Sequence, residues 1–245
     1  MKPLRLAWLR LTGCSGCQLS LLNAEPQLAA AASCIEVIRF PMLSSHHGRL
    51  EQLDAALVEG ALTTPEELSE LMMLRRCTPF LIAVGACALS GGVPALAGER
   101  RGERFAEVYE PEKPCHNFPP QPVRSFVRVD LEIPGCPPEP EELLVALGSL
   151  AHGGPPELDS YPVCFECRLR ENRCLLFETS PRHPCLGALT RAGCQARCPS
   201  LGIPCEGCRG RLPEARLEAL KELLVEAGFT RDFLDARLNR FGEAP

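Results

Sequence analysis

Cysteine is the feature that most constrains what this chain can fold into. Among its 245 residues 15 are cysteine, an odd total that argues against a framework made only of disulfides. Twelve of them fall into three groups of four. The first group is Cys14, Cys17, Cys87 and Cys136, the second is Cys164, Cys167, Cys174 and Cys185, and the third is Cys194, Cys198, Cys205 and Cys208.

The N-terminus predicts a cytoplasmic chain. Its apolar stretch is short, is interrupted by Arg5 and Arg10, and shows no cleavage-site pattern of a secretory signal peptide. No apolar run approaches the roughly 18 residues of a membrane span. In a reducing compartment, dense cysteine indicates metal binding rather than disulfides. A net charge of -5 without a basic stripe gives no case for nucleic acid as a partner.

Each group supplies the four thiolates that a cubane 4Fe-4S cluster requires, so the chain predicts three such clusters. Zinc is the alternative, because four cysteines also bind zinc, usually as two Cys-x2-Cys pairs. Only one such pair occurs in each of the second and third groups, and the run Cys194-x3-Cys198-Pro199 is typical of ferredoxins. The spacing favours iron–sulfur clusters and leaves a zinc-stabilised interaction module as a competing hypothesis.

The first half of the chain alternates predicted strands and helices. Short apolar runs predict strands over residues 4–11, 35–40, 55–58, 80–84 and 127–133. Helices are predicted over 19–32, with a break at Pro26, and over 141–150. Thr64, Pro65 and Glu67 predict a helix that begins with a capping box. Strands separated by helices indicate an α/β fold with a parallel, doubly wound sheet.

Three of the cysteines in the first group follow predicted strands. Cys14, Cys87 and Cys136 each come directly after one. Ligands of open α/β sheets bind beyond the carboxyl ends of the strands, so these segments are expected to meet at one edge of the sheet. Small residues in Cys14-Ser15-Gly16-Cys17 would let both sulfurs reach the same cluster.

The composition changes near residue 155. Residues 161–210 hold eight cysteines with several prolines and glycines and little regular apolar pattern, so metal clusters are expected to supply cross-links that an ordinary core would not. Residues 213–227 and 231–240 predict two terminal helices. Residues 98–122 predict a long surface excursion, and Cys34, Cys77 and Cys115 remain without a ligand role. Cys34 and Cys77 flank strands and are expected to be buried thiols.

Seven stretches carry a resemblance to a known family. They are LTGCSGCQLSLL, LVEGALTTPEE, VGACALSGG, PGCPP, PVCFECRLRENRCL, PCLGALTRAGCQARCPS and CEGC, and they span residues 11–208. The chain resembles the small, electron-transfer subunits of cytoplasmic nickel–iron hydrogenases, of the sulfhydrogenase delta and methyl-viologen-reducing type. The resemblance implies a flavodoxin-like parallel-sheet domain at 1–155. It also implies a small, irregular iron–sulfur domain with terminal helices at 156–245.

The resemblance also gives each group a place in a relay. It implies that the first group holds the proximal cluster, the third group the medial cluster and the second group the distal cluster. Periplasmic relatives have histidine where this chain has Cys164, and often a 3Fe-4S medial cluster. The full cysteine set therefore implies three 4Fe-4S clusters at fairly low potential, since histidine ligation raises the potential in known cases.

The implied function is electron transfer between the nickel–iron centre of a separate large subunit and a further redox partner near the distal cluster. No paired cysteines are left over for a nickel–iron site, so this chain by itself is not expected to activate hydrogen. A cluster subunit of a complex I-like oxidoreductase is the alternative, but the eight-cysteine C-terminal segment argues against it.

Glu59 is a candidate for a role at the proximal site other than metal ligation. Glu59-Gly60 matches a glutamate–glycine pair that recurs in the family beside the proximal cluster, so the resemblance implies a role for Glu59 behind the ligands. A glutamate at a strand end that makes a backbone hydrogen bond is the alternative, and both remain open at this point.

Overall fold

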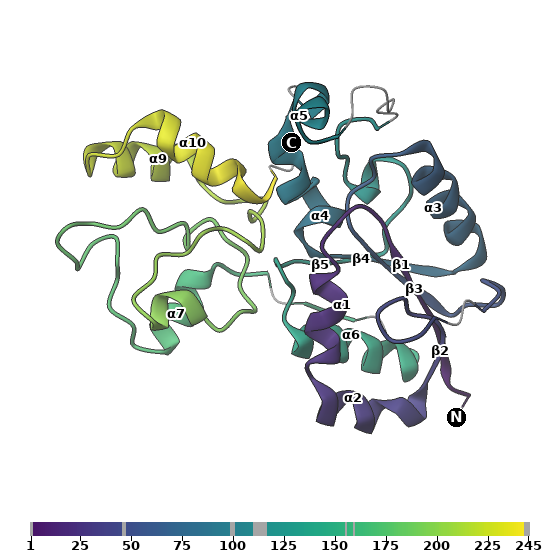
Figure 1. The fold of residues 1–245 in the computed structure, drawn as a ribbon. Coiled ribbons are helices and arrows are strands. Elements are labelled where there is room, and N and C mark those ends of the chain that lie inside the picture. Colours follow the sequence, from purple (N-terminus) through teal and green to yellow (C-terminus); the bar gives the residue numbers. More distant parts are fainter. Residues whose placement is uncertain are drawn as a thin grey trace.

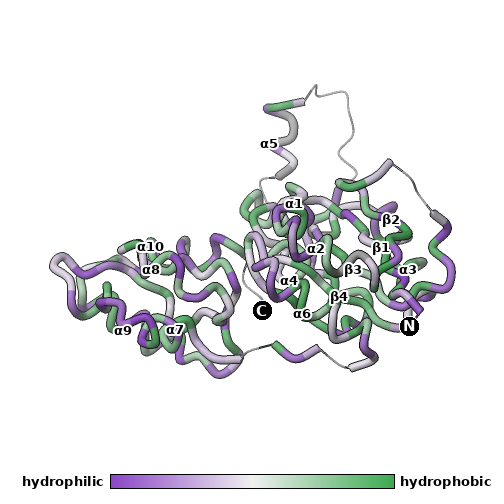
Figure 2. Tube along the Cα trace, turned by 90° about the horizontal axis from the view of Figure 1, so that it is seen from below, coloured by the Kyte–Doolittle hydropathy of each residue, from purple (hydrophilic) through white to green (hydrophobic). Residues whose placement is uncertain are grey.

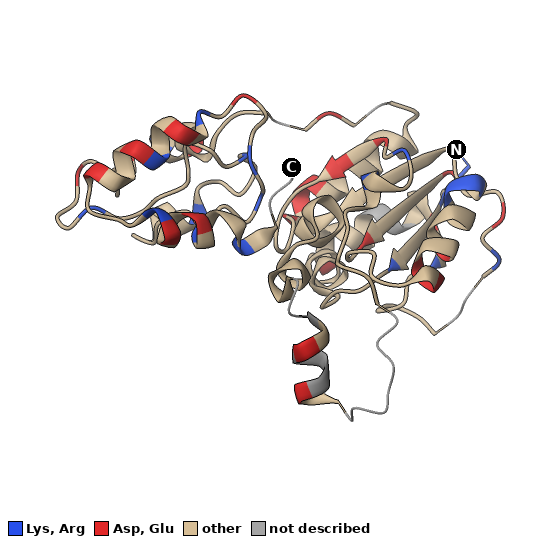
Figure 3. Cartoon of the chain, turned by 90° about the horizontal axis from the view of Figure 1, so that it is seen from above, with Lys and Arg blue, Asp and Glu red and all other residues tan. Residues whose placement is uncertain are grey.

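The computed structural model describes residues 2–45, 48–98, 101–109, 117–154, 156–158 and 160–242. Two parts are visible in Figure 1: a sheet part, residues 2–154, and a cysteine-rich part, residues 160–242. Cys115 and parts of the predicted excursion at 98–122 lie outside the described residues. Within that excursion, helix α5 (Arg101–Val108) projects away from the sheet in Figures 2 and 3.

Five parallel strands form the centre of the sheet part. They are β1 (Leu4–Arg10), β2 (Ile35–Arg39), β3 (Ala55–Glu59), β4 (Phe80–Val84) and β5 (Leu131–Ile133), in the order β2-β1-β3-β4-β5. This is the flavodoxin-like order, and it confirms the α/β fold class. Its topological switch point lies between β1 and β3, where the chain leaves the sheet in opposite directions.

Successive side chains of a strand point to opposite faces of the sheet, so a core forms on each face. Leu6 and Trp8 of β1 pack on the face covered by α1 (Gly16–Leu22), α2 (Glu25–Ala31) and α6 (Pro140–Ala151). Ala7 and Leu9 pack on the opposite face, beneath α3 (Pro65–Cys77) and α4 (Gly85–Ser90). The period of two follows from the pleat of a strand. Figure 2 shows apolar residues gathered in these central elements.

Three local predictions were wrong. The helix predicted over 19–32 is two helices, because the break falls at Asn23–Ala24, and Pro26 occupies the first turn of α2, where its missing N–H breaks no helical bond. The last strand begins at Leu131 rather than residue 127, since Asp130 already turns its carboxylate to the backbone of β4. Cys34 and Cys77 are half-buried, not buried.

The cysteine-rich part has little regular structure before its two last helices. It contains α7 (Val163–Leu169), α8 (Arg197–Ser200), α9 (Leu217–Glu226) and α10 (Arg231–Leu238). The last two confirm the predicted terminal helices. Leucines of α9 and α10 pack against Leu176, Leu186 and Leu189 in a small core. Charges of both signs are interspersed on these helices (Figure 3).

The two parts are joined by polar contacts and by the C-terminus. Arg209 forms an ion pair with Glu142 of α6, and Arg197 with Glu139. Beyond α10 the chain returns to the sheet part, where Ser90 donates a hydrogen bond of 2.7 Å to the carbonyl of Phe241. Among the described residues, no helix is long and apolar enough to cross a membrane.

Candidate metal centres

The structure brings the first group together at the carboxyl edge of the sheet. Cys14 lies in the loop after β1, Cys17 in α1, Cys87 in the first turn of α4, and Cys136 after β5. Cys87 is therefore helical rather than in a loop. Burial raises the pKa of the Cys87 thiol to about 11, and Cys136 and Cys14 add to the rise, so these thiols lie within electrostatic range of one another.

Close packing of backbone against sulfur shapes this site. Gly85 begins α4 with φ +82°, a conformation that favours glycine. A side-chain carbon at this position would collide with the Sγ of Cys17. From the other side, Ser20 of α1 donates a hydrogen bond of 2.7 Å to the carbonyl of Pro138, which holds the Cys136 loop against α1. The loop geometry is therefore set by residues that are not ligands.

Glu59 lies at the end of β3 and is buried, with 2% of its surface exposed. It accepts hydrogen bonds from the backbone N–H of Gln18, at 3.2 Å, and from the side-chain amide of Gln18. Burial raises the pKa of the Cys17 thiol well above its usual range, and the neighbouring Glu59 carboxylate adds to it. Glu59 therefore both accepts a backbone hydrogen bond, from Gln18, and lies beside a predicted ligand, Cys17.

The second group forms a separate site in the cysteine-rich part. Cys164 and Cys167 lie in α7, and Cys174 and Cys185 in the irregular chain after it. Burial raises the pKa of Cys164 to about 11, with contributions from Cys185, Cys167 and Cys174, so all four thiols lie within electrostatic range. The Sγ atoms of Cys164 and Cys185 lie 3.4 and 3.6 Å from the position of a side-chain carbon on Gly187.

The third group lies between the other two. Cys194 precedes α8, Cys198 lies in it, and Cys205 and Cys208 follow it. Burial raises the pKa of Cys208 to about 11, and Cys194 and Cys198 raise it further. Burial also raises the pKa of Cys205, to about 12, against the opposing Thr190 hydroxyl. Thiols of this kind are protonated at neutral pH, so metal binding has to release their protons.

Contacts between the groups place them in one order. The backbone of Cys136 lies close enough to the Cys208 thiol to oppose the rise of its pKa, so the first group borders the third. The backbone N–H of Cys205 donates to the Sγ of Cys185 at 3.3 Å, which joins the third group to the second. A cavity of about 540 Å³ lies between the first and third groups and is lined by Cys136, Cys194, Cys198, Cys205 and Cys208. Within the part of the chain described, no three His, Cys, Asp or Glu side chains converge on a single-ion site.

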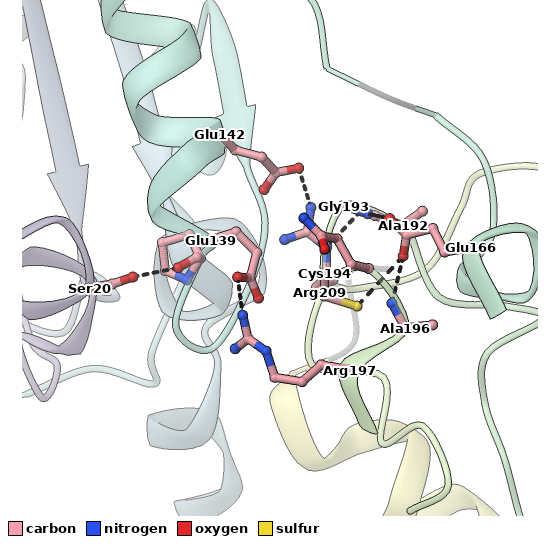
Figure 4. Close-up of polar contacts among 12 residues, drawn as sticks. Ser20, Glu139, Glu142, Glu166, Ala192, Gly193, Cys194, Ala196, Arg197 and Arg209 are labelled. Carbon is pink, nitrogen blue, oxygen red and sulfur yellow. Dashed lines mark hydrogen bonds and ion pairs between the residues drawn. The ribbon is translucent and has the colours of Figure 1, made fainter. Parts of the chain in front are cut away.

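Sequence reasoning missed two buried charged residues around the third group. Glu166 lies between Cys164 and Cys167 but accepts hydrogen bonds from the backbone of residues 193 and 196. Arg209 follows Cys208, is 3% exposed, and donates to the carbonyls of Ala192 and Pro134 and to Glu142. Both are adjacent to predicted ligands, which is the one signal the sequence offers for them. Figure 4 shows these contacts.

Comparisons of the sequence with known proteins place the chain in a family. Residues 14–150 match the family model for the 20 kDa subunit of NADH ubiquinone oxidoreductase. The chain is 39% identical over 233 residues to the delta subunit of sulfhydrogenase 2 from Pyrococcus furiosus, a match that covers 93% of this chain and 97% of the relative.

Solved structures of hydrogenases share the fold. A chain of an NAD+-reducing [NiFe]-hydrogenase in the H2-reduced state has a TM-score of 0.56 at 31% identity and covers 64% of this chain and 96% of its own length. A chain of the [NiFeSe]-hydrogenase of Dm. baculatum has a TM-score of 0.59 at 21% identity and covers 87% of this chain and 97% of its own length. The second likeness extends beyond the sheet part and concerns the fold alone.

Proposed function

Because this chain belongs to the family of the 20 kDa subunit of NADH ubiquinone oxidoreductase and, within it, to the small subunits of nickel–iron hydrogenases, we propose that it relays electrons through three 4Fe-4S clusters. The electrons would pass between the nickel–iron site of a large subunit and a further redox partner. The enzyme is an oxidoreductase, and this chain is its electron-transfer subunit.

One observation carries the three-cluster proposal: the cysteine groups are joined in series. Cys136 of the first group lines one cavity with all four cysteines of the third, and the N–H of Cys205 donates to the Sγ of Cys185 in the second. The first, third and second groups would thus hold the proximal, medial and distal clusters. Contacts of this kind would keep successive clusters near each other. A 4Fe-4S cluster, when bound, accepts and gives up one electron.

The donor set fits this cofactor. Each group offers four cysteines, the number of thiolate ligands that a cubane 4Fe-4S cluster needs. No histidine or carboxylate is required to complete a ligand set. Twelve cysteines in three groups leave Cys34 and Cys77, which are half-buried, and Cys115, which lies outside the described residues. The chain's own residues would bury the clusters and set the charges around them.

Glu59 is proposed to act behind the proximal ligands. Its carboxylate adds to the raised pKa of Cys17 and is held in place by two hydrogen bonds from Gln18. A fixed negative charge beside a cluster disfavours the reduced state. The alternative of a purely structural glutamate predicts no effect of its charge on the cluster.

The proposed location is the cytoplasm, since free thiols in this number persist in a reducing compartment. The domain boundary near residue 155 is likewise proposed, on the separation of the sheet part from the cysteine-rich part. Whether the acceptor beyond the distal cluster is a nicotinamide-reducing flavoprotein or another carrier does not alter the roles assigned to this chain.

The experiment is metal analysis of the complex, produced anaerobically with its large subunit. About twelve iron and twelve acid-labile sulfide per chain are expected. Cys208→Ser should lose iron and the medial signal in electron paramagnetic resonance, whereas the control Cys34→Ser should lose neither. About two zinc without sulfide would contradict the proposal and leave an interaction module.

A further inference from the structure

Glu166 is a buried carboxylate that stands among the distal ligands in the sequence but faces the medial group in space. It lies in α7 between Cys164 and Cys167, and 8% of it is exposed. In Figure 4 its side chain points across to the loop that carries Cys194. A residue inside a Cys-x2-Cys pair is expected to serve that pair, so this orientation calls for a different role.

Both carboxylate oxygens are used by the medial loop. Oε1 accepts a hydrogen bond of 2.8 Å from the N–H of Gly193, and Oε2 one of 3.1 Å from the N–H of Ala196. Oε2 also lies 3.9 Å from the Sγ of Cys194. The carboxylate therefore holds the loop on both sides of a medial ligand.

The backbone of this loop is shaped to receive an anion. Gly193, Gln195 and Ala196 all have positive φ, at 114°, 56° and 49°. Such turns direct successive N–H groups into one concavity, which in other proteins binds anions. Here the anion is supplied by the chain itself. The loop holds a conformation unusual for Gln195 and Ala196 because Glu166 bonds its N–H groups.

We propose that Glu166 is a positioning residue of the medial cluster, although the distal ligands flank it in sequence. Its negative charge lowers the reduction potential of the medial cluster. The inference rests on the proposed function. Reduction adds a negative charge to a cluster, and a carboxylate near Cys194 opposes that addition. Arg209 is a cation beside the same loop, since its guanidinium donates to the carbonyl of Ala192, and it is paired with Glu142.

The test is a potentiometric titration, followed by electron paramagnetic resonance, of the whole complex carrying Glu166→Gln. Glutamine keeps the size and one acceptor but removes the charge and turns an amide N–H2 toward one of the two N–H donors. The medial signal is expected to move to a more positive potential, while the distal and proximal signals stay at the wild-type values. Cys198→Ser identifies the medial signal and Cys174→Ser the distal one.

Glu171→Gln is the matched control, because Glu171 is an exposed carboxylate just beyond α7. It removes the same charge and is expected to leave all three potentials unchanged. An unchanged medial potential in Glu166→Gln with full iron, or a shift of the distal signal alone, would overturn the inference. Loss of about four iron with the medial signal, while the distal signal remains, would support it.

A second variant, Glu166→Asp, covers the case in which Glu166→Gln loses more than the medial cluster. If Glu166→Gln loses both clusters of the cysteine-rich part, Glu166→Asp retains the charge and is expected to restore iron and a medial potential close to wild type. Failure of Glu166→Asp to restore the medial signal, when the distal signal returns, would count against positioning by charge. If the wild-type complex itself lacks three clusters, the proposed function fails, and not merely the role of Glu166.

Discussion

At the scale of single residues, the sites depend on groups that do not ligate metal. Gly85, Glu59 and Glu166 shape or charge the space around predicted ligands, and each does so through a contact that only a folded chain makes. Non-glycine residues with positive φ cost about 1–3 kcal/mol each, so the loop with Gln195 and Ala196 needs compensating bonds. The Glu166 carboxylate provides two of them.

Gly85→Ala is expected to disrupt the proximal site. The added methyl group would meet the Sγ of Cys17, and alanine disfavours φ +82°. The complex should lose about four iron per chain and the proximal signal, as measured by iron analysis and electron paramagnetic resonance. Gly148→Ala in α6 is the control, since nothing lies within 4 Å of the new carbon, and it should keep all iron. Full iron in both variants would contradict this account of the site.

At the scale of elements, the ends of strands and helices place the ligands. The capping box predicted from Thr64 and Glu67 is confirmed, with the Thr64 hydroxyl accepting from the Glu67 N–H at 3.2 Å, so α3 begins where the sequence indicates. The start of the edge strand β5 is harder to predict from the sequence. It is three residues long, and a partly buried ion pair between Arg75 and Asp130 at its start fixes its register before the Cys136 loop.

Asp130→Asn is expected to weaken that register. Burial alone would raise the pKa of Asp130, but the Leu81 N–H and the Arg75 guanidinium hold it below its usual range. Because the folded pKa is lowered, the stabilisation is complete above the pKa of an unfolded aspartate, about 3.9, and is lost only as pH falls below it. The effect should therefore be the same at pH 8 and pH 5.5.

Amide hydrogen exchange measures this effect. The loss of a charged hydrogen bond, about 1.5 kcal/mol, should speed exchange at Leu81 and in residues 128–133 about tenfold after correction for intrinsic rates. Glu132→Gln, which alters an exposed ion pair with Arg124, is the comparison and should have little effect. A difference that grew between pH 8 and pH 5.5 would show that Asp130 titrates in that interval.

At the scale of the whole molecule, the spacing of the sites depends on how the two parts are joined. The Cys136 loop belongs to the sheet part and Cys208 to the cysteine-rich part, and Arg209 links them through the carbonyl of Pro134 at 3.1 Å and the carboxylate of Glu142. Both partners of this ion pair are largely buried. Burial raises the pKa of Glu142 against the opposing influence of Arg209, so the carboxylate depends on its partner.

Arg209→Met is expected to loosen this junction. It leaves the Glu142 carboxylate buried without a partner, a loss of about 3–5 kcal/mol for pairs of this kind. Electron transfer between the proximal and medial clusters should slow, and proteolysis between the two parts should become faster. The double variant Arg209→Met/Glu142→Leu should recover part of the stability, because no unpaired charge remains. Equal instability of the single and double variants would mean that the carbonyl contacts of Arg209, and not the ion pair, hold the parts together.

The sequence by itself determined the α/β class, the capped start of α3 and the terminal helices, and it predicted the division of twelve cysteines into three groups. These follow from local rules: the period of a strand, the bonding needs of a helix start and the number of thiolates a cluster requires. The kinship to hydrogenase small subunits also lay in the sequence, because stretches such as LTGCSGCQLSLL and PVCFECRLRENRCL carry the resemblance.

Only the tertiary structure decided which groups are neighbours and what surrounds them. Glu166 lies 28 positions before Cys194, and Arg209 lies 67 positions after Glu142, so no local pattern relates them. Their roles arise because burial removes water, and a charge without water must find its partner wherever the fold supplies one. The same packing split the predicted helix at Asn23–Ala24 and delayed β5 to Leu131.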